Sequence, residues 1–91
     1  MSTKEKIQES VDVAELINGT SELVLHNDDV NTFDHVIETL IRVCNHSDIQ
    51  AEQCAMLVHY KGKCTVKTGE FDKLKNQCLQ LLDAGLSAEI V

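Results

Sequence analysis

Residues 22–44 read ELVLHNDDVNTFDHVIETLIRVC, and two different periodicities meet within them. The first five, Glu22–His26, are mostly apolar and predict a short strand with helices packed on one face. From Phe33 onward the apolar residues recur every three or four positions, which predicts an amphipathic helix. Its apolar face holds Phe33, Val36, Ile37, Leu40, Ile41 and Cys44. The polar segment His26-Asn27-Asp28-Asp29 is therefore expected to form a loop between a strand and a helix.

Helix-capping residues mark where the first two helices begin. Asn31 or Thr32 is placed to cap the helix that starts near Phe33. Residues 47–50, Ser-Asp-Ile-Gln, have the pattern of a capping box, so a second helix begins there and runs to about Val58. Apolar residues spread widely around this second helix, which indicates burial between other elements. His59 falls at its C-terminal end.

The remainder of the chain predicts a strand, a helix and a strand. Lys61-Gly62-Lys63 is expected to turn into a second strand over Lys63–Lys67. Thr68-Gly69-Glu70 opens a third helix that stops at Gly85. Ser87–Val91 forms a third strand. The order β-α-α-β-α-β predicts an α+β fold with one sheet layer and one helix layer.

The composition describes one small domain with an N-terminal extension. The 91 residues are 43% hydrophobic, with no tryptophan and no proline, so one aliphatic core is expected. Residues 1–20 are polar and acidic, with weak helical spacing that ends at Asn18-Gly19, and predict a flexible extension. The domain is then formed by residues 21–91.

The charge distribution bears on the class of partner. The net charge is −7, and residues 1–38 hold nine acidic side chains against two lysines. Nucleic-acid binding needs basic side chains to neutralise phosphates, so we do not expect it here. A positively charged ligand or partner is favoured instead.

The four cysteines and the lack of export signals indicate the compartment. Cys44, Cys54, Cys64 and Cys78 contain no C-x-x-C pair and are expected to be small buried apolar residues. No signal-peptide-like or membrane-spanning apolar run is present in the sequence. Free thiols and the absence of these signals predict a protein of the reducing cytoplasm, without membrane contact.

Three short motifs occur in a characteristic order: Asn27-Asp28-Asp29, Val36-Ile37 and Val58-His59-Tyr60-Lys61-Gly62-Lys63. In these motifs the chain resembles the ClpS family, adaptor proteins that hand substrates to the Clp AAA+ protease. The resemblance is close over residues 22–63 and weaker from Thr68 to the end. It implies a three-stranded antiparallel sheet packed against three helices. It also implies a non-enzymatic function without cofactor: recognition of N-degrons, proteins whose first residue is a large apolar one such as Leu, Phe, Tyr or Trp.

The resemblance also implies particular site residues. The ligand's α-amino group is assigned to Asn27, Asp28 and His59. The pocket for the first side chain is assigned to Phe33, Val36, Ala55, Val58 and Ala88. The chemistry agrees, because an ammonium group carries three donors and needs several convergent acceptors, which an amide, a carboxylate and a neutral imidazole can supply.

Several positions depart from the family pattern. Val30, Asn31 and Thr32 stand where the family usually has an aromatic residue followed by Thr-Pro. Phe33 and Ala55 replace two methionines at the pocket mouth. Ala55 is expected to enlarge the entrance and to admit β-branched first residues, while Phe33 narrows it from another side.

The resemblance further implies a partner, the N-terminal domain of a ClpA- or ClpC-like ATPase. Docking on that domain is assigned to Glu70 and Lys75. The extension at residues 1–20 matches in position the segment that such adaptors use during delivery.

Other interpretations of the same residues stay open. Asp28-Asp29 could be an ordinary solvated turn. His59 could have no role beyond complementing the dipole at the C-terminal end of its helix. His26, Asp28 and His59 could bind a metal, although no i, i+4 pair supports it. A hydrolase site would need a serine or cysteine with a motif beside it, and none is evident. The domain could also be ClpS-like with a changed ligand, or an interaction module similar to the ribosomal stalk protein, although such a module would lack the Asn-Asp-Asp motif.

Overall fold

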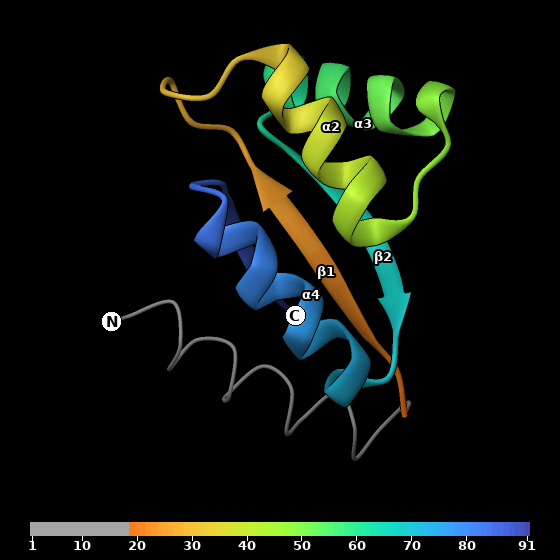
Figure 1. Ribbon diagram of the computed structural model, residues 1–91. Coiled ribbons are helices and arrows are strands. Elements are labelled where there is room, and N and C mark those ends of the chain that lie inside the picture. The colour runs from red at the N-terminus through yellow and green to blue at the C-terminus, as the bar shows by residue number, and fades with distance from the viewer. Residues whose placement is uncertain (1–18) are drawn as a thin grey trace.

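The computed structural model describes residues 19–91, and its six elements follow the predicted order (Figure 1). They are β1 (Ser21–His26), α2 (Phe33–Cys44), α3 (Asp48–Lys61), β2 (Lys63–Gly69), α4 (Phe71–Asp83) and β3 (Ser87–Ile90). The α+β fold class and the β-α-α-β-α-β order are confirmed. The predicted extension lies outside the described residues, apart from Gly19 and Thr20.

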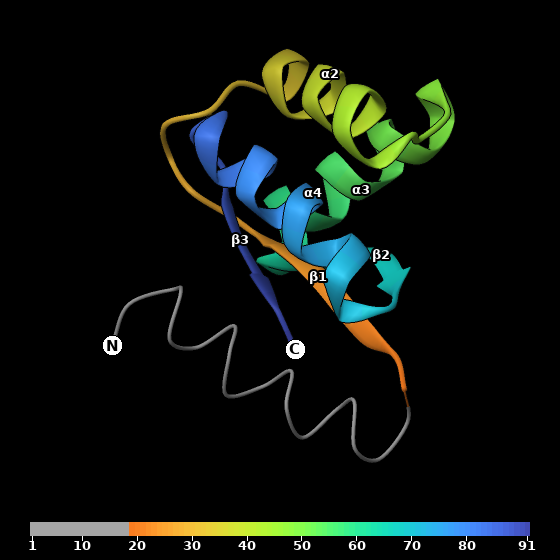
Figure 2. The same cartoon turned by 60° about the horizontal axis from the view of Figure 1, so that its bottom comes forward.

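The three strands form one antiparallel sheet in the order β2-β1-β3. Leu25 in the central strand pairs with Cys64 of β2 on one side and with Ala88 of β3 on the other. The register with β2 shifts between Leu23 and Val24. The helices cover one face of this sheet (Figure 2). The side chains of Leu23 and Leu25 therefore point into the layer between sheet and helices.

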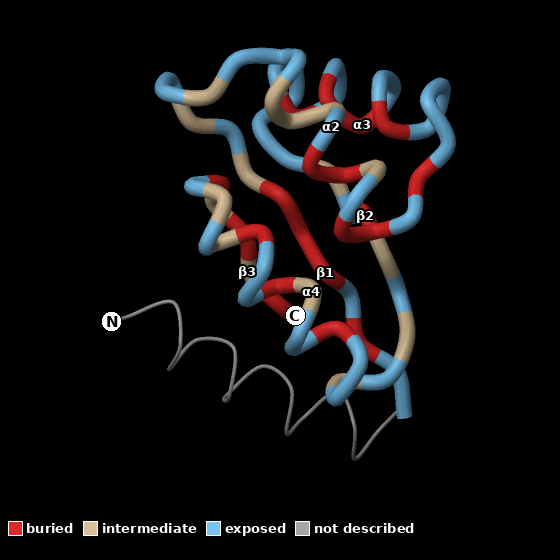
Figure 3. The backbone as a smooth tube through the Cα atoms, viewed as in Figure 1, coloured by how far each residue is buried: buried red, intermediate tan, exposed pale blue. Residues whose placement is uncertain are grey.

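The core between sheet and helices is aliphatic, as predicted from the composition. Leu23, Leu25, Leu40, Leu74 and Leu81 are at most 1% exposed, and the buried segments face one another in Figure 3. Burying a leucine side chain contributes roughly 1.5–3 kcal/mol before the entropy of ordering it is subtracted. All four cysteines are free, and three of them are buried in this core.

The predicted helix starts are confirmed at atomic level for α2 and α3. Thr32 Oγ1 accepts a hydrogen bond of 3.1 Å from the backbone N–H of His35. Ser47 Oγ accepts one of 3.2 Å from the backbone N–H of Gln50. Each bond satisfies an N–H that has no partner within the first turn of its helix.

Two predicted boundaries were wrong. Helix α3 continues to Lys61, past the predicted end at Val58, because Gly62 with φ of 93° is the first residue to leave the helix. His59 therefore lies in the last turn of α3. Strand β2 includes Thr68 and Gly69, which were expected to open the third helix, because both pair with β1.

The prediction that α3 is buried on several sides was also wrong. Its buried residues are Ala51, Cys54, Ala55 and Val58. The larger Met56 and Leu57 are nearly half exposed, and Ile49 and Tyr60 are 71% exposed. The small side chains allow α3 to approach α2 and β2 closely, and this places the large ones on the outer face.

Candidate functional site

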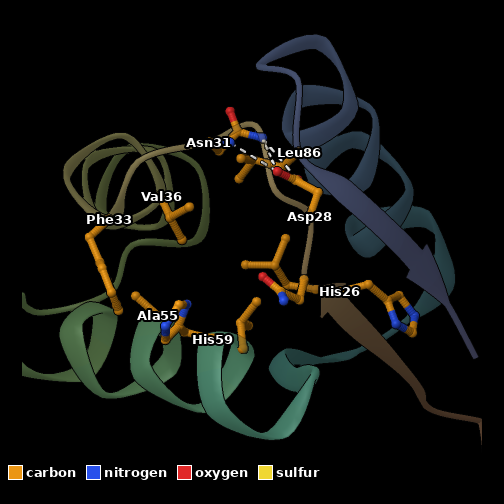
Figure 4. Close-up of a pocket in the computed structure, with 11 residues that line it drawn as sticks. His26, Asp28, Asn31, Phe33, Val36, Ala55, His59 and Leu86 are labelled. Carbon is orange, nitrogen blue, oxygen red and sulfur yellow. Dashed lines mark hydrogen bonds between the residues drawn. The ribbon is translucent and has the colours of Figure 1, made fainter.

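A cavity lies where the β1–α2 loop, the start of α2, the end of α3 and the α4–β3 turn come together (Figure 4). Its volume is about 50 Å³, which is room for a few water molecules or a small apolar group. It is lined by Leu25, His26, Asn27, Asp28, Asn31, Phe33, Val36, Ala55, Val58, His59 and Leu86. Asp28 and Asn31 lie on one side together with Leu86, and Phe33, Val36 and Ala55 lie on the side of the helices together with His59.

The structure brings seven of the eight residues assigned to ligand binding into this one cavity. They are Asn27, Asp28, Phe33, Val36, Ala55, Val58 and His59. Ala88 is not among the lining residues, because it lies deeper in the sheet opposite Leu25 and is 4% exposed. Leu86, at the end of the α4–β3 turn, takes its place in the wall.

The sequence did not assign four of the lining residues to the cavity: Leu25, His26, Asn31 and Leu86. A signal for Leu86 existed in the sequence, since a large apolar residue directly after the helix-ending Gly85 has to turn back toward the core. The sequence indicates either Asn31 or Thr32 as the cap of the helix that starts near Phe33. That role belongs to Thr32.

Asp28 is held by a network of hydrogen bonds from the residues that follow it. Its Oδ1 accepts from the backbone N–H groups of Val30 and Asn31, both at 3.0 Å. The side-chain Nδ2 of Asn31 donates to Oδ1 at 3.0 Å and to Oδ2 at 2.9 Å. Partial burial raises the pKa of Asp28, but the hydrogen bonds from Asn31 and Val30 outweigh it and hold the pKa below its ordinary value. Asp28 is therefore a carboxylate at neutral pH.

The start of α2 is tied to the α4–β3 turn by two side chains. Asn31 Nδ2 donates to the carbonyl oxygen of Gly85 at 2.9 Å. His35 Nε2 lies 2.8 Å from the carbonyl oxygen of Ala84, so this nitrogen carries the hydrogen and donates. These bonds fix the turn immediately before Leu86, and with it one wall of the cavity.

His59 is placed at the mouth of the cavity by aromatic contacts. Its ring centroid is 5.2 Å from that of Phe33, with the planes inclined by 52°, and 4.8 Å from that of Tyr60, with the rings nearly perpendicular. Such tilted and edge-on arrangements are favourable for aromatic rings. Asn27 is fixed through its backbone N–H, which donates to the carbonyl oxygen of Gly62 at 2.9 Å. The β1–α2 loop and the end of α3 are thereby held together.

His26 lies at the cavity edge, and its Nε2 is 3.5 Å from Glu89 Oε2. Among residues 19–91 no group of three or more histidine, cysteine, aspartate or glutamate side chains is arranged to hold a metal ion. In the same part of the chain, no helix is long and apolar enough to cross a membrane.

The residues assigned to ATPase docking lie away from the cavity. Glu70 is the N-cap of α4, and Lys75 is exposed on that helix. Helix α4 begins at the end of the sheet opposite to the β1–α2 loop (Figure 1). The residues assigned to docking and those assigned to the ligand therefore lie on separate surfaces.

Comparison with known proteins identifies the family. The sequence profile of the family described as ATP-dependent Clp protease adaptor protein ClpS matches residues 19–89. The chain belongs to the ClpS family. Relatives named ATP-dependent Clp protease adapter protein ClpS occur in Treponema denticola (34% identical over 62 residues), Thermosynechococcus vestitus (35% over 66) and Rhodococcus opacus (34% over 65). These alignments cover 68%, 71% and 71% of this chain.

The matched region is shorter than the relatives themselves. It spans 61% of the Treponema protein, 70% of the Thermosynechococcus protein and 58% of the Rhodococcus protein. The fold also matches a solved ClpS structure, Agrobacterium tumefaciens ClpS2 bound to L-phenylalaninamide. The TM-score is 0.77 at 22% sequence identity, and the match covers 80% of this chain and 95% of that one. The ClpS fold predicted from the sequence is thus confirmed.

Proposed function

We propose that this protein is an adaptor that binds other proteins by a free α-amino group and a large apolar first side chain, and presents them to a Clp ATPase. One observation carries the proposal. A hydrogen-bonded carboxylate, charged at neutral pH, lies at the edge of a cavity whose far side is apolar. Within a protein, only the N-terminal residue carries an ammonium group on the same carbon atom as its side chain.

The amine would be bound by three groups around the mouth. Asp28 supplies the negative charge, Asn27 an amide oxygen and His59 a neutral ring nitrogen. Charge-assisted hydrogen bonds of this kind are about twice as strong as neutral ones. An N-acetylated chain lacks the charge and two of the hydrogens, so binding it would leave buried acceptors unpaired.

The first side chain would enter the apolar part of the cavity. Leu25, Val36, Ala55, Val58 and Leu86 form its walls. In our proposal Leu86 replaces the Ala88 that the sequence suggested. The structurally similar ClpS2 was solved with L-phenylalaninamide, which combines a free amine with an apolar ring, and this supports the same ligand class for the present cavity.

Delivery would use surfaces outside the cavity. We assign docking on the N-terminal domain of the Clp ATPase to Glu70 and Lys75, and a role in delivery to the extension at residues 1–20. We place this activity in the cytoplasm, with no catalysis by the adaptor itself.

The test is binding of short fluorescent peptides by anisotropy. Peptides that begin with Leu or Phe should bind with a free amine and lose binding when acetylated. Asp28→Ala should abolish binding, whereas Asp29→Ala, a matched change at an exposed neighbour, should leave it intact. Equal affinities for the free-amine and the acetylated peptides would instead support a ClpS-like domain with a changed ligand. Capture of translation GTPases in place of a Clp ATPase would support the stalk-like module.

A further inference from the structure

The side chain of Asn31 links the loop that carries Asp28 to the turn that carries Leu86. Its Nδ2 lies 3.0 and 2.9 Å from the two carboxylate oxygens of Asp28 and 2.9 Å from the carbonyl oxygen of Gly85. An amide nitrogen has two hydrogens. One therefore serves Gly85, and the other is shared between the two carboxylate oxygens. Figure 4 shows the bonds between Asn31 and Asp28 at the upper edge of the cavity.

The two oxygens of the Asp28 carboxylate accept different numbers of hydrogen bonds. Oδ1 accepts three contacts, from the backbone N–H of Val30, the backbone N–H of Asn31 and the amide of Asn31. Oδ2 accepts only the shared amide hydrogen of Asn31 among the described residues. A carboxylate has about four acceptor positions, two on each oxygen. The remaining capacity for a ligand is therefore on Oδ2.

We propose that Asn31 is a positioning residue for ligand recognition: it orients the Asp28 carboxylate so that Oδ2 faces the incoming ammonium, and it locks this acceptor to the turn before Leu86. The inference rests on the function proposed above and deepens it. The side-chain amide of Asn31 thus holds two parts of the site at a fixed separation: the Asp28 carboxylate, which would bind the amine, and Leu86, which would contact the first side chain. Ligands with a free amine and an apolar side chain at that separation are then favoured over ligands that present only one of the two.

An amide is suited to this position because it has two donors. Threonine, which the family pattern has here, offers one hydroxyl hydrogen and could serve the carboxylate or the carbonyl of Gly85, but not both. Aspartate has the size and shape of asparagine but no donor, and it would face the Asp28 carboxylate with a like charge. Replacing Asn31 by alanine, threonine or aspartate therefore distinguishes the effect of its hydrogen-bond donors from the effect of its size and shape.

The experiment measures the affinity of free-amine and acetylated Leu peptides for full-length Asn31→Ala, Asn31→Thr and Asn31→Asp. We expect Asn31→Ala to weaken free-amine binding by about ten-fold, Asn31→Thr by less and Asn31→Asp by more, since hydrogen bonds to charged groups are at the strong end of the range. Asn76→Ala, the same deletion at an exposed position of α4, should change nothing. If Asn31→Asp binds like the wild type, shape alone suffices and the inference is overturned. Affinities of all three variants within two-fold of the wild type would overturn it equally.

A second readout needs no ligand. Asn31→Ala and Asn31→Thr should make the side-chain carboxyl carbon of Asp28 titrate at higher pH in NMR spectra of the unliganded protein. An unchanged titration would overturn the positioning role even where peptide binding fell, and Asn31→Thr decides if the alanine variant does not fold. A wild-type protein that binds no free-amine peptide would refute the proposed function, and the ligand role of Asn31 with it.

Discussion

The rings of Phe33 and His59, with centroids 5.2 Å apart, join the start of α2 to the last turn of α3 at the mouth of the cavity. Ala55 lies one helical turn before His59 and also lines the cavity. The entrance is thus narrow where Phe33 stands and wide beside the single methyl group of Ala55. Under the proposed function, the shape of this entrance would determine which first side chains can enter the cavity.

We predict that peptides beginning with Ile or Val bind this protein with a free amine. Their branched Cβ needs width close to the amine, and Ala55 leaves that width free. Leu and Ile side chains have the same number of carbon atoms, so the discrimination of about 1–3 kcal/mol for a missing methylene does not apply between them, and affinity for Ile should be within about ten-fold of that for Leu. Fluorescence anisotropy with Leu, Ile and Val peptides measures this.

Ala55→Met restores the methionine of the family pattern and tests the role of Ala55. It should reduce binding of Ile and Val peptides more than binding of Leu peptides, because the longer side chain refills the entrance. Wild-type protein that binds Leu but neither Ile nor Val would defeat this prediction.

Affinity for free-amine peptides should decrease as the solution becomes acidic. A histidine nitrogen accepts a hydrogen bond from an ammonium only when it is unprotonated, and histidine side chains commonly gain a proton as pH falls through about 6.5. We therefore expect affinity to be lower at pH 5.5 than at pH 7.5. His59→Gln should flatten this dependence, whereas His26→Gln, a change to the other cavity histidine, should retain it. A flat wild-type profile would remove His59 from the amine site.

Asp28 should make the stability of the protein depend on pH in the acidic range. Its pKa is lowered in the folded state from the ordinary value of 3.8. The stabilisation it provides is therefore fully present above that value and is lost as pH falls through the lower pKa of the folded state. Urea unfolding at pH 6 and at pH 3 should show a smaller loss of stability for Asp28→Asn than for the wild type. Equal losses would show that the hydrogen bonds to the carboxylate do not stabilise the fold.

The architecture could be predicted from the sequence because its signals are local. The apolar stripe beginning at Phe33, the serine cap at Ser47 and the glycine at Gly85 each specify an element without reference to the rest of the chain. The exposure of α3 could not be predicted this way. Which side of a helix is buried depends on how closely its neighbours approach, and that is decided by small residues such as Ala51 and Ala55.

The lining of the cavity was predictable where one short motif contributes several groups and less so where distant segments meet. Asn27 and Asp28 are adjacent, and periodicity puts His59 on the same side of α3 as Ala55. The bond from Asn31 to Gly85 joins residues 54 positions apart, and nothing in either local segment indicates it. Leu86, just before β3, and Ala88, within it, are two positions apart and both are buried, so only the position of the turn decides which of them reaches the cavity.

Gly85 should be needed for the stability of the α4–β3 connection. Its φ is 89°, a conformation that residues with a Cβ rarely adopt. Gly85→Ala should lower the free energy of unfolding by about 1 kcal/mol, measured by urea denaturation. Asn45→Gly, at a left-handed position with φ of 57°, relieves strain and should have an effect of opposite sign or none. A Gly85→Ala protein as stable as the wild type would show that the turn rearranges freely.

Peptide binding and ATPase binding should be separable by mutation, because the two proposed surfaces lie at opposite ends of the sheet. Glu70 caps α4 without a side-chain hydrogen bond to the helix, so replacing it should cost little stability. We expect the double variant Glu70→Ala, Lys75→Ala to bind free-amine peptides with wild-type affinity and to bind the N-terminal domain of a Clp ATPase at least ten-fold more weakly, as is usual when interface charges are removed. Asp72→Ala, Lys73→Ala makes the same change in charge on the same helix and serves as the control.

If the two double variants bind the ATPase equally well, α4 is not the docking surface. If instead the first variant loses peptide binding, the two surfaces are coupled through the α4–β3 turn that Asn31 and His35 hold.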